Sequence, residues 1–180
     1  MPVEFHLHQF GLYVAMMKPL LFVALLSLNA VEVLSGEYRA VTIETGQRRI
    51  FRVPNLETIT GSSGRCVEEG LDGETMEAIW IEASCEGVRT SMVWKKDGTR
   101  MHVMACAEDV ETRTSAQLKL RQQVQKEVKA HKSVTACVRN GRVEVWGWVM
   151  SEDDLATFTA LEKKHRDTVK SFVEVVKPEQ

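Results

Sequence analysis

The chain has 180 residues, 44% of them hydrophobic and 27% charged, with a formal net charge of -2. This is ordinary globular composition, and the length accommodates one domain or two small ones. The near-neutral charge and the lack of any Lys/Arg run argue against nucleic-acid binding, and no low-complexity tract is present.

The N-terminal segment has the layout of a secretory signal peptide. Lys18 supplies the positive charge, residues 19–28 form a short apolar stretch, and a cleavage position follows Ala30. The alternative is a membrane anchor over residues 10–34, which would place Lys18 near the middle of the bilayer, where a charge is costly. We therefore expect residues 1–30 to be removed on export, and an anchored protein if they are retained.

Export determines how the four cysteines are interpreted. In an oxidising compartment four cysteines allow three complete pairings. We favour a disulfide between Cys66 and Cys85, because both lie in loops that bound a strand expected over residues 76–83. The other cysteines are Cys106 and Cys137. No C-x-x-C motif occurs and no His lies at ligand spacing from a Cys, so we expect no zinc site.

The stretch that precedes Cys106 is nearly all β in pattern. Glu68 and Glu69, between two turn signals, are interpreted as a solvent-exposed face. Alternation and turn residues predict a hairpin over 38–53 that turns at 45–47, strands over 56–60 and 76–83, loops at 61–64 and 72–73, and a hairpin over 88–106 that turns at Asp97-Gly98.

The hydrophobic period changes after Cys106. Residues 107–113 are polar and charged and are interpreted as a linker. Thr114, followed three positions later by Gln117, fits a capping box at the start of a helix. Apolar residues then recur every four positions and predict an amphipathic helix that ends near His131; they are Ala116, Leu120, Val124 and Val128.

The strongest local pattern in the chain lies over residues 133–150. Two alternating runs flank Asn140-Gly141, a dipeptide typical of a two-residue hairpin turn. That turn fixes the register and places Val138 opposite Val143. One face of the hairpin is then made of Val and Ala, and the other face carries Thr135, Cys137, Glu144, Trp146 and Trp148.

A second helix and a last strand are expected after this hairpin. Ser151 precedes three acidic residues, which suit the positive end of a helix dipole. Residues 169–176 form the last strand. The order helix, hairpin, helix, strand fits an αββαβ two-layer sandwich with both helices on one face of the sheet. Gly147 would lie on the helix-facing side, where its missing side chain would let a helix approach closely.

No constellation of residues in the sequence indicates catalysis. The chain contains no G-x-S-x-G elbow, no H-E-x-x-H and no P-loop or dinucleotide motif. Gly61-Ser62-Ser63-Gly64 lacks the ending of a phosphate loop, and His102 is more simply a sheet histidine than a catalytic base. Glu152-Asp153-Asp154 could bind a cation, but a capped helix start explains it. We expect no enzymatic activity, no metal and no cofactor.

The residues of greatest functional interest are Trp146 and Trp148, with Thr135 and Cys137 beside them. Alternating residues of one strand point to the same side, here the side away from the helices. Exposed apolar patches commonly mark interfaces. Two alternatives follow: the preceding β region folds over this face, or another subunit docks on it.

Both halves of the chain resemble known families. Residues 113–178 are similar to a BON domain through VTACVRNGRVEVWGWV with its Asn-Gly turn, the capped helix from Ser151 and the closing VKSFVEVV. Residues 31–109 resemble the pilus-formation N-terminal domain through VTIETGQRRIFRVPNLETI, with Gly46 before its second strand, and through EGVRTSMVWKKDGTRMHVMAC. The resemblance implies an α+β protein: a signal peptide, a small all-β domain and an αββαβ BON-like sandwich.

The two domains in this order resemble the periplasmic N-terminal region of Tad-type pilus and type II secretion secretins. This implies a non-enzymatic periplasmic component of a pilus-assembly or secretion apparatus that acts through protein–protein contacts. The expected partners are proteins of that apparatus, of which a secretin is one candidate, and a homo-oligomer is left open. Those secretins continue into a barrel-forming domain, whereas this sequence ends at Gln180, so we do not expect it to form a channel.

Stand-alone BON proteins imply an alternative function. In that case the protein would bind phospholipid or the cell envelope, with direct contact to membrane lipid. This alternative leaves the N-terminal β-domain without a role.

Overall fold

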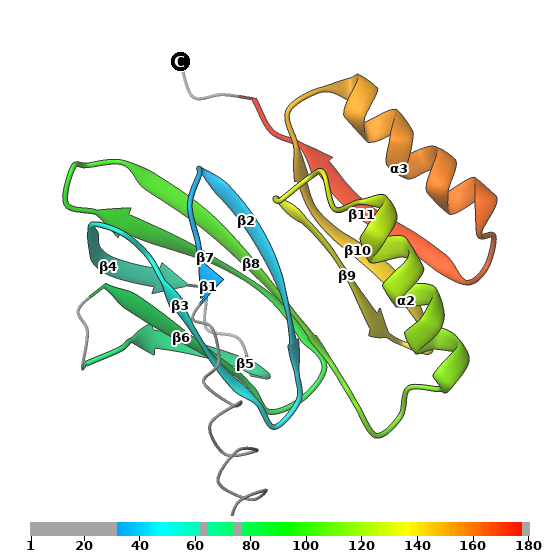
Figure 1. Ribbon diagram of the computed structural model, residues 1–180, viewed down its shortest axis with the longest axis horizontal. Coiled ribbons are helices and arrows are strands. Elements are labelled where there is room, and N and C mark those ends of the chain that lie inside the picture. The colour runs from blue at the N-terminus through cyan, green and yellow to red at the C-terminus, as the bar shows by residue number, and fades with distance from the viewer. Residues whose placement is uncertain (1–31, 62–64, 74–76, 178–180) are drawn as a thin grey trace, which may run out of the picture. The chain divides into compact units, whose positions relative to one another are not determined.

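The computed structural model of the protein describes residues 32–61, 65–73 and 77–177 (Figure 1). They fall within one compact unit, Glu32–Gln180. The expected signal peptide over residues 1–30 and most of the 61–64 loop lie outside the described residues. The elements are β1 (Glu32–Val33), β2 (Tyr38–Glu44), β3 (Arg48–Arg52), β4 (Leu56–Gly61), β5 (Val67–Leu71), β6 (Ala78–Ala83), β7 (Gly87–Lys95), β8 (Arg100–Glu108), α2 (Ser115–Glu127), β9 (Val134–Arg139), β10 (Arg142–Val149), α3 (Glu152–Lys164) and β11 (Val169–Val175).

The strands form three sheets within the described residues, so the fold is mixed α+β. Sheet A has the order β1-β3-β6-β5, sheet B the order β2-β8-β7-β4, and sheet C the order β11-β10-β9. Sheets A and B enclose one hydrophobic core, to which Phe51 and Ile79 contribute from sheet A and Val41 and Val103 from sheet B. We call β1 to β8 the β region and α2 to β11 the αββαβ unit.

The predicted hairpin over residues 38–53 is wrong, although both of its strands exist. β2 pairs in parallel with β8 in sheet B, whereas β3 pairs antiparallel with β6 in sheet A. The turn between them bonds to both sheets: the Thr45 N–H donates to Glu108 C=O, and the Gly46 N–H donates to Ala83 C=O. The turn is therefore an arch that carries the chain from one layer of the sandwich to the other.

Strand β5 was not predicted, and the expectation that Glu69 is solvent-exposed is wrong. Glu68 is exposed, but the Glu69 carboxylate lies 2.7 Å from Arg89 Nε, and the two side chains are only 4% and 11% exposed. The Ser91 hydroxyl also donates to this carboxylate. An ion pair occupies the inward position of β5, so the strand lacks the apolar alternation that would have revealed it.

The hairpin of β7 and β8 is confirmed, with Val93 opposite Met101. The linker expected over residues 107–113 begins later than predicted, because β8 continues through Ala107 and Glu108, which are both fully buried. A polar residue at the end of a strand resembles the start of a loop in sequence. Here that residue is Glu108, and its buried contacts are described below.

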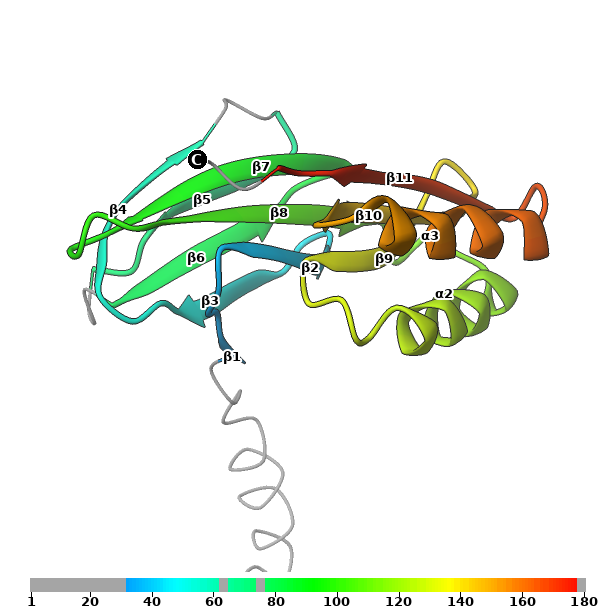
Figure 2. The ribbon, with the colours of Figure 1, turned by 90° about the horizontal axis from the view of Figure 1, so that it is seen from above.

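The hairpin of β9 and β10 has the predicted register, with Val138 opposite Val143 and Val134 opposite Gly147. Asn140 and Gly141 adopt the positive φ angles of +50° and +73° that a two-residue turn of this kind requires. The parallel strand β11 completes sheet C beside β10. Figures 1 and 2 show both helices on the side of sheet C away from the β region.

The helices cover the Val and Ala face of sheet C. Thr114 forms the predicted capping box with Gln117 at the start of α2, which ends at Glu127, one turn before the predicted end. Phe158 and Leu161 of α3 and Val124 of α2 contribute to the core of this unit.

Gly147 is required for a different reason from the one expected. A Cβ atom there would lie 2.1 Å from the Ser133 carbonyl oxygen and 2.7 Å from Val134 Cα, at a φ of +147°. The close neighbour is thus the backbone at the start of β9, not a helix. The same close approach lets the Trp148 N–H donate to the Ser133 carbonyl at 3.0 Å.

Candidate interaction site

Sheet C has a second face, opposite the helices, which includes all four residues singled out from the sequence as an interface. The structure places Thr135, Cys137 and Trp148 under the β region, where they are 4%, 0% and 7% exposed. The sequence left two alternatives for this face, burial under the β region or docking of another subunit. For these three residues the structure shows burial under the β region. Trp146 remains half-buried.

A disulfide between Cys106 and Cys137 joins the two parts of the protein at the centre of this junction. Cys106 lies on β8 and Cys137 on β9, and both are fully buried. This pair was not predicted from the sequence. A signal was present, because both cysteines occupy alternating positions in strands, but sequence alone does not give the packing of one sheet on another.

Polar contacts flank the disulfide on the β2 side. The hydroxyl oxygens of Thr42 and Thr135 lie 2.7 Å apart, and the Thr42 hydroxyl donates to Ala136 C=O at 3.0 Å. The Gln125 side-chain oxygen accepts from the Ala136 N–H at 2.8 Å. Side chains of β2 and α2 thereby satisfy the backbone of the outer edge of β9.

Glu108 is the second link between the two parts and was missed by sequence reasoning. Its carboxylate is fully buried and accepts from Arg113 at 2.5 Å and from Arg121 at 2.9 Å. It also accepts from the Val138 N–H on β9 at 2.9 Å. A buried carboxylate is tolerated only with such charge-assisted partners, so Glu108 fixes the end of β8, the start of α2 and the edge of β9 together.

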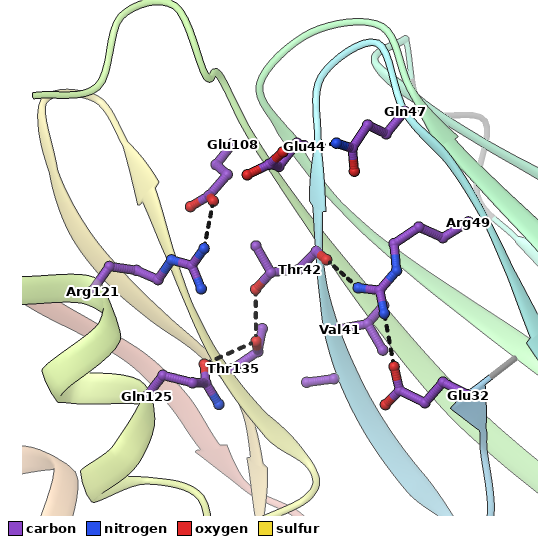
Figure 3. A pocket seen from close by; sticks show the side chains of 11 residues that line it. Glu32, Val41, Thr42, Glu44, Gln47, Arg49, Glu108, Arg121, Gln125 and Thr135 are labelled. Atoms are coloured by element: carbon purple, nitrogen blue, oxygen red, sulfur yellow. Dashed lines mark hydrogen bonds and ion pairs between the residues drawn. The ribbon is translucent and has the colours of Figure 1, made fainter. Parts of the chain in front are cut away.

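A cleft of about 350 Å³ opens along this junction, between β2 and the α2 side (Figure 3). Its charged groups already have partners: Arg121 pairs with Glu108, and Arg49 pairs with Glu32 at 2.9 Å. Gln47 donates to Glu44 at 2.8 Å. The cleft is therefore part of the polar contact between the β region and the αββαβ unit. Its described lining residues include no free acid–base pair.

Aromatic packing closes the other end of the junction. The ring of Trp148 lies 5.4 Å from that of Tyr38 and 6.2 Å from that of His102, and the Tyr38 and His102 rings stack at 4.9 Å. His102 thus packs as a sheet histidine. The three rings seal β2, β8 and β10 against one another.

Trp146 lies beside the junction rather than in it. Its ring stacks on Phe172 of β11 at 4.3 Å, and the Arg139 guanidinium lies 5.8 Å from the ring centroid. Its indole N–H donates to the buried Glu144 carboxylate at 3.0 Å, which also pairs with Arg139 at 3.1 Å. Trp146 and Phe172 form a partly exposed aromatic surface that we call the aromatic pair.

A separate groove of about 530 Å³ lies where α3 ends and β11 begins. Its charged side chains come from the start of β10, from α3, from the connection between α3 and β11, and from β11. The cationic ones are Arg142, Lys163, Arg166 and Lys170, and the anionic ones are Glu162 and Asp167. Lys170 Nζ lies 2.5 Å from Glu162, and this bond holds the pKa of the Glu162 carboxyl below its ordinary value. The groove has an excess of positive charge.

A second disulfide joins Cys66 and Cys85, the pair favoured from the sequence, across the ends of β5 and β6. Two disulfides are compatible with an exported protein. Among the described residues, no helix is both long and apolar enough to span a membrane. No group of three or more His, Cys, Asp or Glu side chains in these ranges could hold a metal ion.

Comparison with known proteins adds no relative: no protein-family model matches the chain, and no curated protein is similar to it in sequence.

Proposed function

We propose that the protein is a non-enzymatic component of a pilus-assembly or protein-secretion apparatus, located in the periplasm and acting beside a secretin through protein–protein contacts. The observation that carries the proposal is the order of its parts. A disulfide-bonded β region precedes an αββαβ unit with an Asn-Gly hairpin, which is the order that the resemblance to secretin N-terminal regions implies.

The junction supports this role physically. Cys106–Cys137 and the buried contacts of Glu108 hold the two parts in a fixed relation. A protein that acts only by contact benefits from such rigidity, because a preorganised surface loses less conformational entropy on binding. The aromatic pair, flanked by Arg139, has the residue types enriched at protein interfaces.

Site-specific photo-crosslinking in the native cell tests the proposal. A photoreactive residue at Trp146 should crosslink to the secretin, identified with a secretin antibody, whereas the same residue at the exposed Lys119 of α2 should not. Deletion of the gene should reduce piliation or secretion. Unchanged piliation and secretion together with no secretin crosslink would contradict the proposal.

A second candidate function, binding to anionic phospholipid, is favoured by the groove at the end of α3. Its cations outnumber its anions, and clustered Lys and Arg attract anionic lipid surfaces. The full chain should then co-sediment with phosphatidylglycerol vesicles but not with phosphatidylcholine vesicles, without any partner. The double variant Lys163→Glu/Arg166→Glu should abolish that binding, whereas Lys119→Glu on α2 should retain it.

A further inference from the structure

The two edges of sheet C differ in how their backbone groups are satisfied. On β9, Gln125 accepts from the Ala136 N–H and Glu108 accepts from the Val138 N–H. Side chains thus block this edge against a further strand. Proteins commonly protect sheet edges in this way, because an open edge is a template for pairing.

The β11 edge is largely open. Among the described strands, β11 pairs only with β10. The Val143 N–H donates to the Thr168 carbonyl, so the backbone N–H and C=O groups of the even-numbered residues of β11 face β10. The odd-numbered groups therefore point outward. The Ser171 N–H reaches Glu162 at 3.3 Å, but among the described residues nothing accepts from or donates to the outward groups of Val173.

The sequence of β11 is complementary to itself. If two copies pair antiparallel with Phe172 opposite Phe172, Lys170 of each copy lies opposite Glu174 of the other. Shifting the centre to Glu174 would set two carboxylates against each other, and centring on Val173 would place Phe172 opposite Glu174. Only the first register matches opposite charges and aromatic rings together, and such cross-strand pairs stabilise sheets.

The side chains required are on the accessible face. Phe172 and Lys170 are half-buried and Glu174 is exposed. Phe172 already stacks on Trp146 at 4.3 Å, so the pairing would continue the aromatic stack across the two copies. The direction of the backbone groups is consistent with this register. The N–H and C=O of Phe172 point toward β10, so the central Phe172 pair would be of the non-hydrogen-bonded type, in which opposed side chains lie closest.

We propose that β11 is a self-association edge, through which two copies of the chain pair antiparallel about Phe172 into a continuous six-stranded sheet. Lys170 must then turn from Glu162 toward the second copy, and the Ser171 N–H must exchange Glu162 for the second copy's Val173 carbonyl. Both bonds to Glu162 lie at the surface, where exchange costs little. This proposal is independent of the function proposed above.

Sedimentation of the full chain at increasing concentration tests it. The wild-type protein should pass from monomer to dimer. Ser171→Pro removes the outward N–H that would donate to the second copy, at a half-buried position of an edge strand, where proline is tolerated, and should abolish the dimer. Glu174→Lys should raise the dissociation constant about tenfold or more, since symmetry turns two attractions into two repulsions. The double variant Lys170→Glu/Glu174→Lys should restore association.

Cysteine crosslinking fixes the register. Under oxidation Phe172→Cys should give a covalent dimer, because opposed residues of this pair type lie about 4.5 Å apart at Cα. Glu174→Cys is the control, since its two copies would lie about 13 Å apart along the strands. A protein that stays monomeric at every concentration, a dimer unaffected by Ser171→Pro, or crosslinking at residue 174 in preference to 172 would overturn the proposal.

Discussion

At the residue scale, Trp146 and Trp148 show how different two alternating side chains of one strand can be. Trp148 packs against Tyr38 and His102 of the β region and is 7% exposed. Trp146 stacks on Phe172 of the same sheet, lies beside Arg139 and is half-buried. Their contributions to folding should therefore differ, although the sequence pattern treats them alike.

Trp148→Ser should lower the free energy of unfolding by about 3–5 kcal/mol, because it empties a large buried aromatic site. Trp146→Ser should cost less, about 1–2 kcal/mol, mainly from the lost stacking on Phe172. Urea unfolding of both variants measures the difference. Equal losses from the two substitutions would show that the junction does not bury Trp148 as described.

Gly147 gives a second test at this scale. Gly147→Ala would force a Cβ within 2.1 Å of the Ser133 carbonyl oxygen, so the start of β9 must move and the Trp148 N–H loses its partner. We expect a loss of at least about 1–3 kcal/mol in thermal or urea unfolding. Gly73→Ala, where a Cβ would meet nothing within 4 Å, is the matched control. A neutral Gly147→Ala variant would refute the close approach.

For single helices and strands, the sequence pattern predicted the structure correctly where the turn or capping residues and the apolar periodicity indicated the same element. The Asn140-Gly141 turn and the alternation on both sides led to the observed register of β9 and β10. The capping box at Thr114 began α2 as expected. In each case the residues that contact one another lie close together in the sequence, so a local pattern is enough to predict the element.

The failures have the opposite cause. Residues 38–53 have the same alternation and a glycine turn, yet β2 and β3 enter different sheets because β8 and β6 compete for them. The local sequence around Glu69 and Glu108 suggests solvent exposure, but each carboxylate is buried in an ion pair with an arginine from another strand or helix, Arg89 and Arg121 respectively. The Cys106–Cys137 pair likewise depends on sheet packing. Contacts between distant residues decide these points.

The ion pair between Glu162 of α3 and Lys170 of β11 predicts that stability depends on pH. The hydrogen bond from Lys170 holds the Glu162 pKa below its ordinary value of 4.5. A lowered carboxyl pKa in the folded state gives stability above pH 4.5 that is lost as the pH falls through the folded pKa. The pair is partly exposed, so the gain should be about 0.2–1 kcal/mol. A double-mutant cycle of Glu162→Gln, Lys170→Met and the double variant tests this, with the free energy of unfolding measured at several pH values. The coupling energy between the two side chains should be present at neutral pH and disappear in acid. Coupling that is absent at neutral pH would contradict this.

At the scale of the whole molecule, the two parts should unfold together. Glu108→Ala leaves Arg113 and Arg121 without their buried carboxylate and the Val138 N–H without an acceptor. Removal of one partner from a buried charge cluster costs about 3–5 kcal/mol. Glu108→Gln should cost less, because an amide oxygen can still accept from Val138.

Glu111→Gln, an exposed carboxylate in the same connection, should be neutral. Calorimetry should show one transition in the wild-type protein and a lower, broader one in Glu108→Ala. If Glu108→Ala melts like the wild-type protein, Glu108 does not link the two parts.

The β region and the αββαβ unit form one body that is joined through the disulfide between Cys106 and Cys137, and the β region has a second disulfide of its own. Non-reducing peptide mapping of the protein, isolated from the compartment in which it accumulates and alkylated at once, tests this most directly. We expect two linked peptide pairs, Cys66 with Cys85 and Cys106 with Cys137, and no free thiol. Alkylated Cys106 and Cys137, or either of them joined to Cys66 or Cys85, would contradict it.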